Sequence, residues 1–175
     1  MPHAANPGST YYPVRLLASL ALPFERQMPA VLVVQFALAG LGAFLLLRAL
    51  GARPWIALVA GVLYELTGVT TSAVYAGHDG RIVVATLTPL FLWTLHGIVR
   101  TGRPAHVAGA AAVLGAALLS FQLQSVYYLL LAGLAWSVFL LVHHGVARDR
   151  ALLGRRVGLG LGAVALGFAV GGVVL

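Results

Sequence analysis

The sequence contains no cysteine and no lysine, and only four of its 175 residues are acidic. Without cysteine the chain can form no disulfide, no thiolate metal site and no cysteine nucleophile. Charged residues make up 9% of the chain and hydrophobic residues 61%, whereas soluble domains carry about 25% charged residues. A water-soluble protein of this composition could not cover its surface with polar groups. The chain is therefore predicted to be an integral membrane protein.

The net charge of +7 comes from eleven arginines. They are scattered over the segments between apolar runs and form no soluble basic domain, so no nucleic-acid partner is expected. The bias of such residues toward cytoplasmic loops explains this charge without a polyanionic ligand.

Long apolar runs predict an all-α fold, a polytopic transmembrane helix bundle with about six spanning helices and an N-terminal surface-lying helix. A spanning helix needs about 20 residues, and the predicted spans are residues 29–50, 54–75, 81–99, 105–121, 125–142 and 157–175. Residues 1–28 are expected to form a loop and an interfacial amphipathic helix, with a plain surface loop as the rival interpretation. Because the last run ends without a polar flank, we expect the chain to be a fragment of a larger protein.

The arginines also predict an orientation. Eight lie in the loops after the first, third and fifth predicted spans, against three elsewhere, namely Arg15, Arg26 and Arg81. By the positive-inside rule the arginine-rich loops are cytoplasmic. The N-terminal segment and the loops at residues 75–81 and 121–125 then lie on the extracytoplasmic face.

The segment Tyr75-Ala-Gly-His-Asp-Gly-Arg81 is a short polar island between apolar runs. Glycines on both sides of His78 and Asp79 permit a tight turn or a close approach to a ligand. A carboxylate at Asp79 could act as a general base, or could bind a divalent metal ion together with His78. The alternative is a solvated turn in which Asp79 caps the following helix.

Glu65 lies inside the second predicted span, and ionisable groups within a membrane are costly and often functional. It could carry a proton or face a substrate cavity, or it could be a protonated packing residue. Gln122 and Gln124 suit recognition of sugar or phosphate groups, with interhelical hydrogen bonding as the alternative. Tyr128 could stack on a ligand, although an aromatic belt is the usual role of such tyrosines.

Gly167-x-x-x-Gly171 is the close-packing pattern of membrane helices. No phosphate-binding loop is indicated by the glycines of this region, because neither a lysine nor a strand accompanies them.

The Tyr75–Arg81 island, the helix with Pro89 that follows, and the segment Gln122-Leu-Gln-Ser-Val-Tyr-Tyr128 resemble the YfhO family of bacterial membrane proteins. The linker Arg48–Trp55 also looks like that family, and the resemblance covers roughly residues 6–145. YfhO proteins are similar to GT-C glycosyltransferases, which are polytopic enzymes of the bacterial inner membrane. The resemblance therefore implies transfer of a sugar from a polyprenyl-phosphate donor to a cell-wall polymer or glycolipid acceptor on the outer face.

The resemblance implies catalytic roles for Asp79 and His78 and substrate-binding roles for Arg81, Gln122, Gln124, Tyr128 and Glu65, with a divalent cation at Asp79 as a further possibility. No acidic residue precedes Glu25, so the first catalytic carboxylate of such an enzyme would be missing and the piece would be inactive alone. A transporter or flippase module and a structural membrane subunit are the alternatives.

Overall fold

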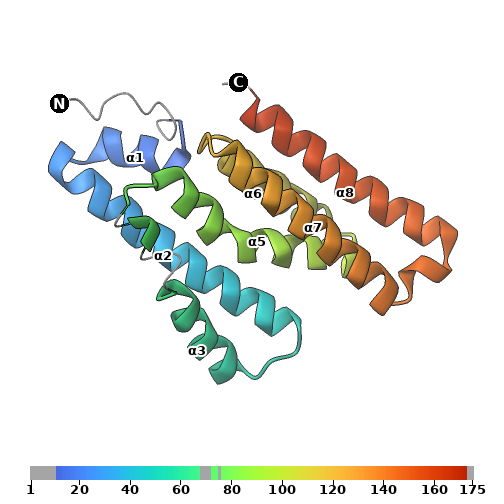
Figure 1. Cartoon of the computed structure of the whole chain (residues 1–175). Coiled ribbons are helices and arrows are strands. Elements are labelled where there is room, and N and C mark those ends of the chain that lie inside the picture. The colour runs from blue at the N-terminus through green and yellow to red at the C-terminus, as the bar shows by residue number, and fades with distance from the viewer. Residues whose placement is uncertain (1–10, 68–71, 75, 173–175) are drawn as a thin grey trace.

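The computed structural model describes residues 11–67, 72–74 and 76–172, which form helices joined by short turns (Figure 1). No strand occurs within this described part. The elements in chain order are α1 (Pro13–Ala21), α2 (Phe24–Ala49), α3 (Pro54–Glu65), α5 (Asp79–Thr101), α6 (Pro104–Leu118), α7 (Leu123–His143), the 3-10 helix η3 (Val146–Arg148) and α8 (Arg150–Gly171).

Local signals in the sequence explain several helix ends. Proline occupies the first turn of α1, α3 and α6, where its missing N–H costs nothing and its fixed φ suits a helix. The Asp149 side chain caps α8 by accepting hydrogen bonds from the amides of Ala151 and Leu152 at 2.9 and 3.1 Å. Gly102, with φ 62°, ends α5 in the left-handed conformation typical of a helix C-terminus.

Helix α5 lies at the centre of the bundle. It packs against α2, α6 and α7, and 72% of its most apolar stretch is buried, against 33% for α2, 22% for α7 and 11% for α8. Helix α8 packs mainly on α6, while α7 packs mainly on α5. The two C-terminal spans therefore run beside the bundle with little contact between them (Figure 1).

Small residues set the close helix contacts. A Cβ atom at Gly42 of α2 would lie 2.9 Å from the Leu90 amide nitrogen, and one at Gly133 of α7 would lie 2.8 Å from Phe91. The predicted Gly167-x-x-x-Gly171 pattern packs on α6, where a Cβ at Gly167 would lie 2.9 Å from Leu114. Glycine allows these backbones to approach, as in other membrane bundles.

The prediction of an all-helical membrane bundle is confirmed, but the prediction of six spans is wrong. Among the described residues, four helices, α2, α5, α7 and α8, are long and apolar enough to cross a membrane. The helices α3 and α6 have 12 and 15 residues. At about 1.5 Å per residue they reach roughly 18 and 22 Å, less than the roughly 30 Å of a bilayer core.

Several helix boundaries differ from the predicted ones. Helix α2 begins at Phe24, so Pro29 lies inside it rather than at its start. Helix α5 begins at Asp79 and α8 at Arg150, earlier than the predicted residues 81 and 157. Apolarity predicts the middle of a span well, but a helix continues into polar residues wherever its backbone hydrogen bonds can be satisfied.

The turns between the helices are divided between the two ends of the bundle (Figure 1). Helix α1, the start of α5 and the α6–α7 turn lie at one end, which we call the polar end. The α2–α3, α5–α6 and α7–α8 turns lie at the other, which we call the arginine-rich end because Arg48, Arg53, Arg100, Arg103, Arg148, Arg150, Arg155 and Arg156 lie in or next to these turns.

Candidate functional sites

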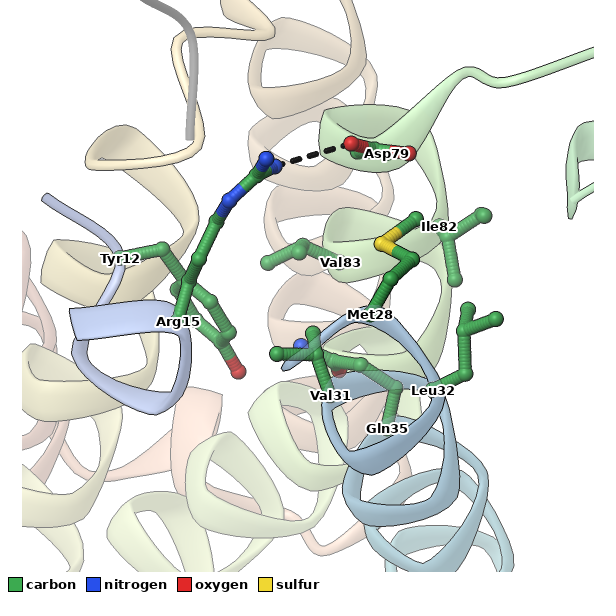
Figure 2. Close-up of a pocket in the computed structure, with 9 residues that line it drawn as sticks. All are labelled: Tyr12, Arg15, Met28, Val31, Leu32, Gln35, Asp79, Ile82 and Val83. Atoms are coloured by element: carbon green, nitrogen blue, oxygen red, sulfur yellow. Dashed lines mark hydrogen bonds and ion pairs between the residues drawn. The ribbon is translucent and has the colours of Figure 1, made fainter. Parts of the chain in front are cut away.

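Asp79 lies in the first turn of α5 and pairs with an arginine that the sequence did not suggest. The Arg15 guanidinium of α1 donates to the Asp79 carboxylate at 2.9 Å, across 64 residues of chain (Figure 2). The side chains are 40% and 29% exposed, so solvent screens this ion pair. Asp79 thus holds α1 against the bundle, and the predicted catalytic role of Asp79 stays a prediction.

Beneath this ion pair, polar side chains connect three helices. Thr86 of α5 donates to the Gln35 side chain of α2 at 2.6 Å, and Tyr12, which precedes α1, lies close to Gln35 (Figure 2). Burial raises the pKa of Tyr12 above its ordinary value of 10.0, and the contact with Gln35 opposes this shift by less. Tyr12 is only 2% exposed, so it anchors α1 in the core rather than lying in an aromatic belt as such tyrosines usually do.

Gln122 lies next to the start of α5. A Cβ atom on Gly80 would lie 2.5 Å from the Gln122 side chain and 2.6 Å from the Ser120 carbonyl oxygen. The preceding residue, Phe121, has φ 56°, a conformation that costs a non-glycine residue about 1 kcal/mol or more. The α6–α7 turn is therefore held tightly against Gly80.

The other predicted site residues do not converge on Asp79. His78 and Arg81 are exposed at the start of α5, and Gln124 and Tyr128 are exposed on α7. Glu65 lies at the end of α3 against Gly40 of α2. Tyr75, the first residue of the predicted island, falls outside the described residues. The roles proposed for all these side chains stay predictions.

The described residues around Asp79 do not supply a set of metal ligands. Within residues 11–67, 72–74 and 76–172, no three His, Cys, Asp or Glu side chains gather closely enough to hold a metal ion. The possible divalent cation stays a prediction from the sequence alone.

Replacing Asp79 by Asn tests how strongly the ion pair holds α1. We expect the free energy of unfolding to fall by only about 0.5 kcal/mol, because the pair is partly exposed. Amide hydrogen exchange of α1 should accelerate, while exchange of α5 should not. A loss of several kcal/mol, or unchanged exchange in α1, would show that the pair does not have this modest anchoring role.

A second site, which the sequence did not predict, lies at the opposite end of the bundle. A cleft of about 370 Å³ opens between α5, α7 and α8. We call it the α5–α7–α8 cleft; α5 residues such as Phe91 and Ile98 line it, α7 contributes Leu134 and α8 contributes Leu161. The lining is apolar except for Ser137 and Arg156.

Arg156 is the unusual residue of this cleft. Its Nε and Nη1 atoms are buried and have no hydrogen-bond partner among the described residues. Its guanidinium lies against Gly102, where a Cβ atom would collide with Arg156 Nη1. Arg156 as a whole is only partly buried, but each buried N–H group without a hydrogen-bond partner costs about 1–3 kcal/mol, and an anion would satisfy these groups.

In the part of the chain that the structure describes, four helices of membrane-spanning length, the buried α5 among them, define a multi-pass helical membrane protein. Over residues 9–173 the chain matches the family described as the 6-pyruvoyl-tetrahydropterin synthase related domain, a membrane protein family. This match takes in nearly the whole chain, and the chain belongs to that family. No curated protein and no solved structure matches it.

The predicted membership of the YfhO family, and the GT-C glycosyltransferase function that it implied, are wrong. The family match covers nearly the whole chain and is to a different family. The resemblance depended on short polar segments between apolar helices, and such segments recur wherever a membrane chain turns at the bilayer surface. Polyprenyl phosphate as a sugar donor has no support once that resemblance is removed.

Proposed function

We propose that this domain binds an anionic phospholipid, with one acyl chain in the α5–α7–α8 cleft and the acidic headgroup at Arg156. The observation that carries the proposal is an apolar cleft lined at one end by Arg156, whose buried Nε and Nη1 atoms have no hydrogen-bond partner among the described residues. Its volume of about 370 Å³ falls in the range of small-ligand sites, about 300–1,000 Å³.

The extent of the cleft suits one leaflet of a bilayer. Along α7 its lining runs from Leu130 to Leu141, and along α8 from Arg156 to Val164. At about 1.5 Å per residue these stretches measure roughly 16 and 12 Å, close to half of the roughly 30 Å hydrocarbon core. Arg156 is therefore at the level expected for a headgroup, and the far end of the cleft at the level of acyl chain ends.

The charges around the cleft favour an acidic headgroup over a zwitterionic one. The arginines at this end that are exposed are Arg48, Arg53, Arg100, Arg103, Arg148, Arg150 and Arg155. The acid among them, Asp149, is already engaged as the cap of α8. Each basic residue near a membrane surface attracts acidic lipid by about 1 kcal/mol.

The proposal also includes an orientation. If the arginine-rich end faces the cytoplasm, as the positive-inside rule favours, the lipid belongs to the cytoplasmic leaflet, where acidic lipids create a negative surface potential. We propose the inner membrane of a bacterium as the location, with the polar end on the extracytoplasmic face.

Gly160 offers a direct test, because it lines the cleft and a Cβ atom there would meet no heavy atom within 4 Å. Gly160→Leu should fill the cleft without disturbing helix packing. With phosphatidylglycerol carrying a photoreactive acyl chain, in bilayer discs, crosslinking to α5, α7 and α8 should fall roughly tenfold, equivalent to about 1.4 kcal/mol.

Gly158→Leu is the matched control, because Gly158 lies in the same helix, also faces open space and does not line the cleft. Its crosslinking should equal that of the unaltered protein. Equal crosslinking in the Gly160 variant would contradict a lipid in the cleft.

A further inference from the structure

Ser137 is the second polar residue of the α5–α7–α8 cleft, and its hydroxyl is available to a ligand. It is half-buried in α7, one turn after Gly133, which packs on α5. Hydroxyls inside helices commonly donate to a carbonyl oxygen one turn earlier, as Thr88 and Thr101 of α5 do at 2.8 Å. The Ser137 hydroxyl forms no such bond with any described residue. A hydroxyl without a partner in apolar surroundings is costly, which favours a ligand that brings an acceptor to it.

The depth of Ser137 relative to the Arg156 guanidinium follows from the helices beside it. The guanidinium lies against Gly102, directly after the end of α5. Val99 of α5 and Leu140 of α7 belong to one apolar cluster, so these two positions are level. Gly102 comes three residues after Val99, toward the arginine-rich end. Ser137 comes three residues before Leu140. At about 1.5 Å per residue, the hydroxyl therefore lies roughly 9 Å deeper than the guanidinium.

A glycerophospholipid has a hydrogen-bond acceptor at this depth. The polar region of each bilayer leaflet is about 5–8 Å thick, and the acyl ester groups lie at its inner boundary. A hydrogen bond adds about 3 Å between its donor and acceptor atoms. A phosphate at Arg156 therefore places an ester carbonyl oxygen within reach of the Ser137 hydroxyl. A free fatty acid, whose carboxylate is its only polar group, offers no acceptor there.

We infer that Ser137 is a specificity-determining residue of the cleft, which donates a hydrogen bond to an acyl ester carbonyl of the bound lipid. The ligand class is a glycerol ester phospholipid, rather than an ether phospholipid or a free fatty acid. Arg156 selects the acidic headgroup, and Ser137 selects the linkage through which the acyl chain is attached. This inference rests on the lipid-binding function proposed above.

Competition between ester and ether lipids tests the inference. The full chain, in discs of phosphatidylcholine, is crosslinked to phosphatidylglycerol with a photoreactive acyl chain while unlabelled phosphatidylglycerol competes. The competitor carries either ester-linked or ether-linked chains of the same length, so that only the carbonyl groups differ. We expect the ether lipid to compete about fivefold less well, equivalent to about 1 kcal/mol for one hydrogen bond between neutral groups.

Three variants assign this preference to the hydroxyl. Ser137→Ala should bind the two lipids equally well, because it has no hydroxyl to donate. Ser137→Thr keeps the hydroxyl and should keep the preference for the ester lipid. Ser125→Ala is the matched control, because it removes a hydroxyl from the same helix at a position that does not line the cleft. Its preference for the ester lipid should equal that of the unaltered protein.

The possible failures of this experiment are distinguishable. Equal competition by the two lipids in the unaltered protein overturns the role of Ser137 and leaves the proposed lipid binding intact. A preference for the ester lipid that persists in the Ser137→Ala variant also overturns that role. If neither lipid competes, the proposed lipid binding fails, and the role of Ser137 fails with it.

Discussion

Replacing Arg156 by Gln is expected to release the bound lipid. Native mass spectrometry of the purified protein should show at least a tenfold loss of retained anionic phospholipid relative to the unaltered chain. The reason is that removing one partner of a buried charge pair typically costs about 3–5 kcal/mol. Water near the headgroup reduces this cost, but about 1.4 kcal/mol already gives a tenfold change in affinity.

Two further variants separate the charge from its position. Arg155 is exposed, so Arg155→Gln removes the same formal charge and should change retention less than about threefold, because a solvated charge contributes little. Gly102→Ala keeps the charge but places a Cβ atom where Arg156 Nη1 lies, so it should weaken retention. Equal losses in the Arg155 and Arg156 variants would indicate a general surface attraction and would contradict a specific site.

The melting temperature of the protein gives a second test of the same site, which does not require bound lipid to be quantified. A ligand that binds only the folded state raises its stability, by about 2.7 kcal/mol at a hundredfold excess over Kd. Phosphatidylglycerol should therefore raise the melting temperature of the unaltered chain in detergent, and phosphatidylcholine should not. The Arg156 variant should lose this response, because the unpaired guanidinium that draws the acidic headgroup is gone.

Gly167→Val is expected to separate α8 from the bundle. A Cβ atom at Gly167 would lie 2.9 Å from both Cβ and Cδ2 of Leu114, and both positions are buried. Overpacking of a well-packed core costs about 1–3 kcal/mol, and a branched side chain between two close backbones belongs at the upper end of that range. Unfolding in mixed micelles, followed by circular dichroism, should show the loss.

Gly158→Val is the matched control, because Gly158 lies in the same helix and a Cβ atom there would meet nothing within 4 Å. Both variants make the same chemical change in α8. We expect the Gly158 variant to be as stable as the unaltered chain within about 0.5 kcal/mol. Similar losses in both would mean that helix propensity, rather than packing on α6, decides the effect.

Composition and local signals were sufficient to predict a helical membrane bundle. The apolar runs located the central parts of the four long helices. Pro54 begins α3 at the first residue of the predicted span, and Pro104 begins α6 one residue before the predicted start at residue 105, because proline favours the first helical turn.

The length of α3 could not be predicted, because the residues at its C-terminus contact residues that are distant in the sequence. The predicted span continued to residue 75, yet the helix ends at Glu65. At this point the Glu65 carboxyl lies against Gly40 and Tyr64 donates to Ala85. Neither contact is visible in a local pattern, and neither is the Arg15–Asp79 pair across 64 residues.

The position of Arg156, by contrast, has a local signal in the sequence. The arginines at residues 148–156 do not all belong to a loop, because α8 begins at Arg150. Asp149 is a favourable N-cap residue, and a helix starting directly after it places Arg156, Gly160 and Val164 at spacings of four on one face. All three line the cleft. The cleft itself required the relative placement of α5, α7 and α8, which a single sequence does not provide.

The most direct test of the lipid-binding proposal is an experimental density map of the protein in bilayer discs that contain phosphatidylglycerol. The proposal predicts a continuous acyl-chain density between α7 and α8 over α5, with headgroup density within hydrogen-bond distance of the Arg156 guanidinium. A cleft closed by α7 meeting α8, or an Arg156 side chain paired with a carboxylate of the protein, would contradict it.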